Sequence, residues 1–210
     1  MQSMNILKHI LAASGAFSLW CAAAQRQGPV PVLEALPTAE SLGAGWSREI
    51  SLLFDPASKP AELFGASSQL SESFKKERLA AVQNPTNRIS GWSHTHFTLH
   101  STNTSRQYEV QVERYRSKDH LRADFDHLLA LDQAEYQKVP VEGVGEAAVF
   151  FCRVNGGSTV WFRRADFRVW ISPMGTITNW EQDVHLQKLV KMLDHQRITG
   201  ATPSQSGKGR

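Results

Sequence analysis

Three histidines in the run Trp-Ser-His-Thr-His-Phe-Thr-Leu-His could bind a metal ion, since imidazole is a common zinc ligand. A strand would project His94, His96 and His100 from one face, opposite Phe97 and Leu99. The Cα atoms of His94 and His96 would lie about 7 Å apart, which suits one ion, whereas His100 would join them only through a bend. No acidic fourth ligand lies in the segment. The run therefore indicates either a metal site at His94 and His96 or a solvated polar strand face.

Two tryptophans and two arginines form a second candidate, a binding surface on the last hairpin. A two-residue turn at Ala165-Asp166 would set Trp161 opposite Trp170 and Arg163 opposite Arg168, all four on one face. Indole rings offer stacking area, and guanidinium groups donate forked hydrogen bonds to carboxylate or phosphate. The pattern predicts a ligand-binding face at these residues or, as the alternative, a second core covered by a helix.

Other motifs give weaker signals. The run from Gly143 to Ala148 matches the spacing of a dinucleotide fingerprint but opens a strand where that motif opens a helix, so we expect a tight turn there and no cofactor. Ser67 and Ser68 lack the second glycine of a nucleophile elbow. Glu109 and Glu113 share a strand face that alternation predicts to be solvent-facing. We expect no catalytic residue.

The charge balance argues against a nucleic-acid partner. The chain has 23 Lys and Arg against 20 Asp and Glu, with a pI of about 9.0. Lys8, Lys208 and Arg210 lie near the ends, so the expected folded part is formally neutral. A nucleic-acid binder needs a net basic patch to neutralise phosphates.

The first 24 residues resemble a signal peptide. Lys8 precedes the uncharged, mostly apolar run 10–20, and three alanines at 22–24 offer a cleavage site. We expect the mature chain to begin near Gln25 and to be periplasmic or secreted. An uncleaved anchor and a lipid on Cys21 are the alternatives. No other segment is long and apolar enough to cross a membrane.

One domain of ordinary size is expected after the leader. Residues 25–32 read as a linker, 33–197 as a single domain and 198–210 as a disordered tail. Cys152 is the only cysteine after the leader, so no intramolecular disulfide can form, and its apolar run predicts a small buried side chain.

Periodicity predicts the elements that position these residues. Alternating or apolar runs predict strands at 47–54, 89–99, 108–116, 147–154, 159–164 and 167–172. Helical signals cover 38–42, 58–63, 71–82, 119–132 and a last helix opening at the Thr178-x-x-Glu181 capping box. We expect an α+β fold. Its antiparallel sheet would end in a three-stranded meander, packed by two main amphipathic helices, those at 119–132 and after Thr178.

Three passages together resemble a known family. They are the run 36–42 leading into Gly45-Trp46, then the run 143–147, then the hairpin 160–171 with a closing helix. Over residues 36–193 this order resembles the extracellular sensor domains of actinobacterial receptor kinases and related exported lipoproteins. The resemblance implies a noncatalytic domain that binds a ligand or partner, and it assigns no functional residue.

Three hypotheses for function follow. The first is an exported, noncatalytic domain that binds a small molecule, a glycan or a protein through Trp161, Trp170, Arg163 and Arg168. The second is a metal-dependent enzyme that uses His94 and His96. The third is a structural, envelope-associated protein, which the sequence does not separate from the first.

Overall fold

The computed structural model describes residues 29–65, 71–102, 104–130, 136–153, 157–175, 177 and 179–195. The expected leader, the tail and Thr178 lie outside these residues.

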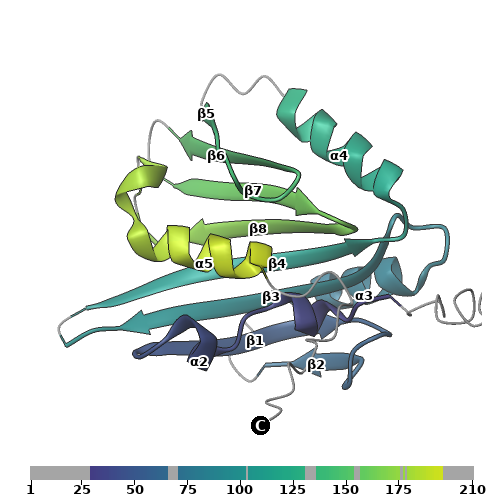
Figure 1. Cartoon of the computed structure of the whole chain (residues 1–210). Helices are drawn as coiled ribbons and strands as arrows, with labels where there is room; N and C mark the ends of the chain where they lie inside the picture. The colour runs from purple at the N-terminus through teal and green to yellow at the C-terminus, as the bar shows by residue number, and fades with distance from the viewer. Residues whose placement is uncertain are drawn as a thin grey trace, which may run out of the picture.

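An eight-stranded antiparallel sheet forms the centre of the fold, with helices on both faces (Figure 1). The strands are β1 (Trp46–Phe54), β2 (Glu62–Phe64), β3 (Ile89–His100), β4 (Ser105–Tyr115), β5 (Tyr136–Pro140), β6 (Ala147–Arg153), β7 (Ser158–Arg164) and β8 (Phe167–Pro173). The helical segments are η1 (Val32–Ala35), α2 (Ala39–Leu42), α3 (Glu72–Gln83), α4 (Lys118–Ala130), η2 (Trp180–Gln182) and α5 (Val184–His195).

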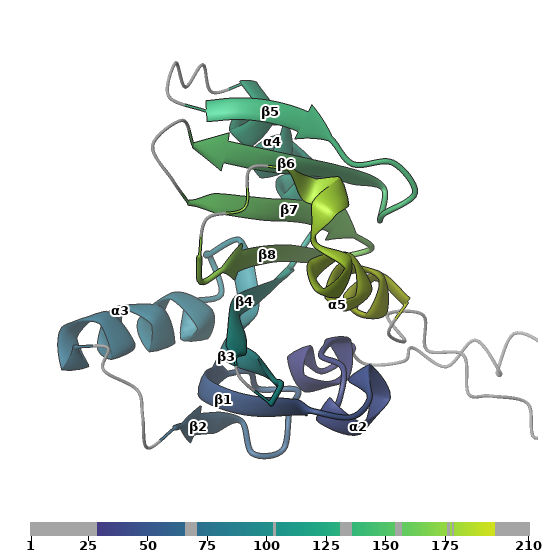
Figure 2. The ribbon, with the colours of Figure 1, turned by 90° about the vertical axis from the view of Figure 1, so that its left-hand side faces the viewer.

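The strand order is β2-β1-β3-β4-β8-β7-β6-β5, and every neighbouring pair is antiparallel. The first half of the chain supplies β1 to β4 and the second half β5 to β8, and the two halves join where β4 pairs with β8. This arrangement confirms the α+β class and the C-terminal meander of β6, β7 and β8. Figure 2 shows the strong twist of the sheet, with α3 and α5 on opposite sides.

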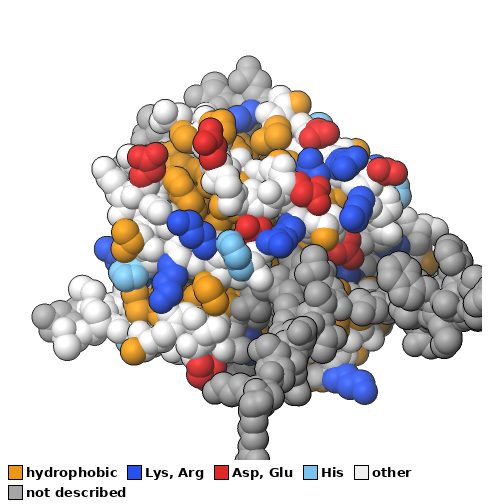
Figure 3. Space-filling view, in the orientation of Figure 1, with side chains coloured by type: hydrophobic (Ala, Val, Ile, Leu, Met, Phe, Trp, Pro, Cys, Tyr) orange, Lys and Arg blue, Asp and Glu red, His pale blue; other side chains and the backbone are white. Residues whose placement is uncertain are grey.

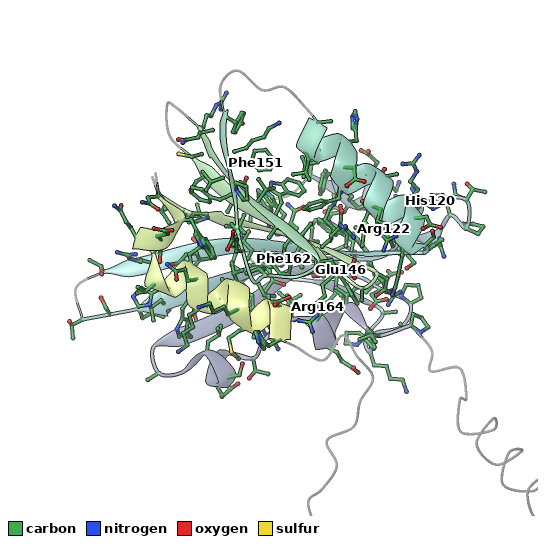
Figure 4. The ribbon with its side chains drawn as sticks, turned by 45° about the horizontal axis from the view of Figure 1, so that its top comes forward. His120, Arg122, Glu146, Phe151, Phe162 and Arg164 are labelled. Carbon is green, nitrogen blue, oxygen red and sulfur yellow. The ribbon has the colours of Figure 1, made fainter. Side chains whose placement is uncertain are left out.

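Helices partly cover both faces of the sheet, because some of its strands carry apolar side chains on each side. We call one face the α5 face; there η1, α2 and α5 pack on the main core, which includes Leu53, Val110, Phe162 and Leu189. We call the other the α4 face. Figure 4 shows Phe162 near α5 and Phe151, from the neighbouring strand, on the other side of the sheet.

Two smaller clusters lie on the α4 face, one under each helix. At one end of the sheet, α3 places Phe74 and Leu79 against Leu52, Phe54 and Trp92. At the other end, α4 buries Phe125 against two residues of β6, Val149 and Phe151. Between these clusters, the α4 face of the central strands carries mainly polar and charged side chains.

The helices expected at 38–42, 71–82 and 119–132 form within a few residues of these ranges, and the last helix forms with a different start. Helix α3 has Ser71 as its N-cap, since the Ser71 Oγ accepts a hydrogen bond from the Phe74 N–H. The last helix, α5, begins at Val184 and not in the capping box; Glu181 lies in η2 instead. Asp183 caps α5, because its Oδ1 accepts hydrogen bonds from the backbone N–H groups of His185 and Leu186 at 3.0 and 2.9 Å. No helix in the described ranges is long and apolar enough to cross a bilayer.

Two short strands were not expected. The predicted helical turn at 58–63 is wrong, since Glu62–Phe64 forms β2 and pairs with the end of β1. The buried Asp55 carboxylate turns the chain there by accepting a hydrogen bond from the Ala57 N–H. Edge strand β5 is largely exposed and lacks a clear apolar alternation. Such a segment gives little periodic signal.

The packed structure includes the end of the segment expected as a linker. Val32 has 0% of its surface exposed, and its N–H donates to the Asp55 carboxylate at 2.7 Å. The Val30 carbonyl accepts a hydrogen bond from Arg114 at 2.9 Å. The chain is therefore attached to the core from Val30 and buried at Val32.

Candidate functional site

Both groups of candidate side chains lie on the α4 face, in one continuous strip. The pairing of four strands aligns His94 with Gln111, Gln111 with Trp170, and Trp170 with Trp161. The next positions along these strands add further polar and charged groups. We call this set the central strip: His94, His96, Glu109, Gln111, Glu113, Trp161, Arg163, Arg168, Trp170 and Ser172.

The hairpin forms as expected. Its turn is Ala165-Asp166, with Ala165 at a φ of 53°, and it sets Trp161 opposite Trp170. The two indole rings lie 6.1 Å apart between centroids, at an angle of 59°. The Arg168 guanidinium lies over the Trp161 ring, 5.4 Å from its centroid. The aromatic and arginine platform is therefore a feature of the fold.

The two arginines are already paired with acids. Arg168 Nε donates to Glu113 Oε2 at 2.7 Å, and Arg163 Nη1 donates to Glu146 Oε2 at the same distance. Glu113 is buried, with 8% of its surface exposed, so the expectation of a solvent-facing carboxylate there is wrong. The guanidinium of the half-buried Arg168 and the buried Glu113 carboxylate stabilise each other's charges. These guanidinium groups are thus engaged within the protein and are poor candidates to bind an anionic ligand.

The two tryptophans differ in their contact with the cluster under helix α4. Trp161 packs against the cluster of Phe125, Val149 and Phe151, and its Nε1 donates to Thr159 Oγ1 at 3.0 Å. Trp170 is half-buried, and its Nε1 has no hydrogen-bond partner among the described residues. The second-core interpretation therefore describes Trp161, while Trp170 is half-buried and belongs to none of the three hydrophobic clusters.

The sequence Asn155-Gly156 favours a hairpin turn, which would place Phe150 beside Trp161, but strand β6 has a different register. Val149 pairs with Trp161 and Phe150 with Val160, so Phe150 faces the main core and not the platform. A shift of one residue moves every side chain of a strand to the other face. The Asn155-Gly156 turn itself lies outside the described residues.

His94 is buried and His96 is half-buried, so the two histidines do not form a fully solvated strand face. His94 has 7% of its surface exposed, stacks on Trp92 and has its Nε2 2.6 Å from Glu109 Oε1. The rings of His94 and His96 lie 4.9 Å apart between centroids. His100, at the end of β3, is held by Ser47 Oγ at 3.1 Å and does not join them.

The structure supplies an acid that the sequence of β3 lacks, but from the adjacent strand. Glu109 of β4 lies opposite His96 and contacts His94. No group of three or more His, Cys, Asp or Glu side chains is arranged to hold a metal ion in the described part of the chain. In the structure, His94 and Glu109 form a hydrogen-bonded contact.

Hydrogen bonding and burial set the charges on this part of the strip. The hydrogen bond from His94 lowers the pKa of Glu109, against an opposing effect of burial. Burial lowers the pKa of His96, and the neighbouring His94 lowers it further. At neutral pH Glu109 is charged and His96 neutral, so the His96 ring carries one donor and one acceptor nitrogen.

The central strip therefore offers an indole ring and neutral hydrogen-bonding groups, since its two arginines are paired with acids and the Glu109 carboxylate is hydrogen-bonded to His94. Gln111 lies beside Trp170, and Ser172 lies one position further along the same face of β8. Sequence inspection missed Gln111 and Ser172 as members of the strip. A correct pairing of the β3–β4 hairpin would have found Gln111. No family model, curated protein or solved structure matches this chain.

Proposed function

We propose that this protein is an exported, noncatalytic binding domain, and that its ligand is a glycan held over Trp170 on the central strip. The observation that carries the proposal is the half-buried Trp170 indole beside Gln111, on central strands that lie between the clusters under α3 and α4. Binding sites combine such apolar contact area with a few placed polar groups.

The chemistry of the strip suits a sugar ring. A pyranose has an apolar face of C–H groups, which can stack on an indole, and a rim of hydroxyl groups. The Gln111 amide, the neutral His96 imidazole and the Ser172 hydroxyl each offer hydrogen-bond groups of the kind that hydroxyls accept from and donate to. The three side chains lie on the same face as Trp170.

The charge pattern favours a neutral ligand. Arg168–Glu113 and Arg163–Glu146 are ion pairs in the strip and at its rim, and the Glu109 carboxylate is hydrogen-bonded to His94. A charged ligand would have to break one of these pairs and leave a partly buried charge unpaired, which costs free energy. A hydroxylated, uncharged ligand leaves all three intact.

Export rests on the leader, whose apolar run and small-residue site are typical of a signal peptide. The resemblance to extracellular sensor domains points to the same compartment and to a noncatalytic role. N-terminal sequencing of native protein should give a start near Gln25. A chain that starts at Met1 and is recovered from the cytosol would contradict export.

Calorimetric titration with chitotetraose, cellotetraose and maltotetraose tests the ligand class. We expect at least one to bind, and Trp170→Ala to weaken that binding by about tenfold or more, as loss of a central aromatic contact does. Trp180→Ala is the matched control, because it removes a half-buried indole from the other face of the sheet. The proposal is wrong if none of the sugars binds, or if the two variants lose the same affinity.

A further inference from the structure

A second site lies on the α5 face, at the end of the sheet that α5 leaves open. A cavity of about 600 Å³ opens there between β5, β6 and η2. Phe150 and Val139, which are paired across β6 and β5, form part of its apolar lining together with Val141 and Trp180. Figure 3 shows hydrophobic side chains gathered over β5 and β6, with acidic side chains beside them. The volume falls in the range of small-molecule sites.

Two carboxylates lie at the rim of this cavity, Glu142 from the turn after β5 and Glu181 from η2. Both residues are exposed, and neither side chain has an ion-pair or hydrogen-bond partner within the described ranges. The cavity therefore combines an apolar patch with polar side chains, Gln137 and Asn179, and with two carboxylates that have no ion-pair partner in the described ranges. This combination differs from the central strip, where the charges are paired.

The wall formed by η2 is held in place before any ligand arrives. Asn179 caps η2 through its Oδ1, which accepts a hydrogen bond from the Glu181 N–H at 2.8 Å. Gln187 of α5 donates from Nε2 to the carbonyl oxygens of Trp180 and Glu181, at 3.3 and 2.9 Å. The backbone that carries the indole and one carboxylate is thus anchored to α5. A preorganised wall reduces the entropy lost on binding.

The opposite wall is anchored as well. Val141 and Val144 flank Glu142 closely in the chain and are buried in the main core. The Val141 N–H donates to the Ala148 carbonyl at 3.1 Å, which closes the turn onto β6. Glu142 therefore projects from a fixed part of the backbone.

We propose that this cavity binds a linear aliphatic polyamine. The methylene chain would lie on the apolar lining, and the ammonium groups would pair with the Glu142 and Glu181 carboxylates. Trp180 adds a ring face that attracts a cation. The site is on the other face of the sheet from Trp170 and uses none of the central strip, so the inference goes beyond the proposed glycan binding and does not rest on it.

Calorimetric titration of the folded protein with spermidine and cadaverine, at about 20 mM salt, tests this site. We expect both amines to bind, and 1,5-pentanediol, which has the same chain length as cadaverine without its charge, to bind at least about tenfold more weakly. Raising the salt to about 300 mM should weaken amine binding, because ions screen exposed charges.

Variants assign the binding to the cavity. The double variant Glu142→Gln with Glu181→Gln, and separately Trp180→Ala, should each weaken spermidine binding by about tenfold or more. Glu62→Gln, at an exposed carboxylate on the far edge of the sheet, is the matched control and should bind as the unchanged protein does. Trp170→Ala should also leave spermidine binding unchanged, which separates this test from that of the glycan site.

Three outcomes would overturn the proposal. The first is spermidine binding no tighter than that of the diol, and the second is equal loss in the cavity variants and in Glu62→Gln. The third is a tetralysine peptide that binds the cavity far more tightly than spermidine, which would make a basic protein segment the ligand. Thermal unfolding of each variant shows whether a loss of binding reflects a loss of fold.

Discussion

Asp55 and Arg114 form an ion pair that is almost completely buried, with 1% and 2% of their surfaces exposed. Arg114 Nη2 lies 2.8 Å from Asp55 Oδ1, and the remaining guanidinium hydrogens reach Ser90 and the Val30 carbonyl. Burial of two charges is tolerated only when hydrogen bonds replace the lost hydration. Here those bonds also attach the N-terminal segment to β3 and β4.

Asp55→Asn should destabilise the fold strongly, because it leaves the Arg114 charge buried without its partner. We expect the free energy of unfolding to fall by about 3–5 kcal/mol, measured by urea denaturation. Asp126→Asn, at an exposed position on α4, is the control and should change it by less than about 0.5 kcal/mol. Similar losses in both variants would show that the buried pair has no special role.

His96 should titrate below the ordinary histidine pKa of 6.5, since burial lowers its pKa. NMR titration of the ring protons measures this value directly. Glu109→Gln should lower the pKa of His96 further, because the Glu109 charge raises it. In the unfolded chain His96 becomes protonated below about pH 6.5, whereas in the folded protein it becomes protonated only at a lower pH. Protonation of His96 therefore lowers the free energy of unfolding as the pH falls. A pKa above 6.5 in the folded protein would contradict this account.

At the scale of elements, the turn that enters β6 depends on two glycines with different surroundings. Gly145 has a φ of +56°, and a Cβ there would lie 2.4 Å from the Arg163 carbonyl oxygen. Its N–H also donates to Asp194 of α5 at 2.9 Å. Gly143 has a φ of +70°, but a Cβ there would meet nothing within 4 Å. The expected tight turn is confirmed, and no helix follows it.

Gly145→Ala should therefore cost more than Gly143→Ala. Both changes force an alanine into the left-handed region, at about 1–2 kcal/mol. Only Gly145→Ala must also move the backbone of β7, so its loss of unfolding free energy should exceed that of Gly143→Ala by about 1 kcal/mol or more. Thermal or urea unfolding measures both. Equal losses would mean that the close approach to Arg163 relaxes freely.

The elements that the sequence predicted well are those with strong local patterns. The alternation of β4, the β7–β8 hairpin and the apolar stripe of α4 appear within a few residues of their expected ranges. Strands β2 and β5 were missed, because they are short, mostly exposed edges whose place depends on their neighbours. The register of β6 was missed because it depends on a loop length, which side-chain alternation does not reveal.

In the candidate sites too, features set by contacts close in the sequence were predictable, and features set by distant contacts were not. Trp161 opposite Trp170 follows from one short turn and was predictable. The pairing of Arg168 with Glu113 requires β4 beside β8, a contact between the two halves of the chain. The cavity at Trp180 requires η2 to return to the β5 edge, which no motif in the sequence indicates.

At the scale of the whole molecule, one core joins both halves of the chain. The main cluster on the α5 face contains Leu42 and Leu53 from the first half, Phe162 and Ile171 from the second, and Leu189 from α5. Helix α5 lies over this shared core, so neither half completes it alone. Domains built around one core generally unfold in a single step.

Leu189→Ala tests this cooperativity, because Leu189 has 0% of its surface exposed and its truncation leaves a cavity in the shared core. We expect the free energy of unfolding to fall by about 2–5 kcal/mol. Hydrogen exchange should report the same fall at the slowest amides of β1 and β3 as at those of β7 and β8, because a single cooperative unit opens as a whole. If only the strands of the second half lost protection, the two halves would be separate folding units. The pairing of β4 with β8 would then be a contact between them and not a part of one core.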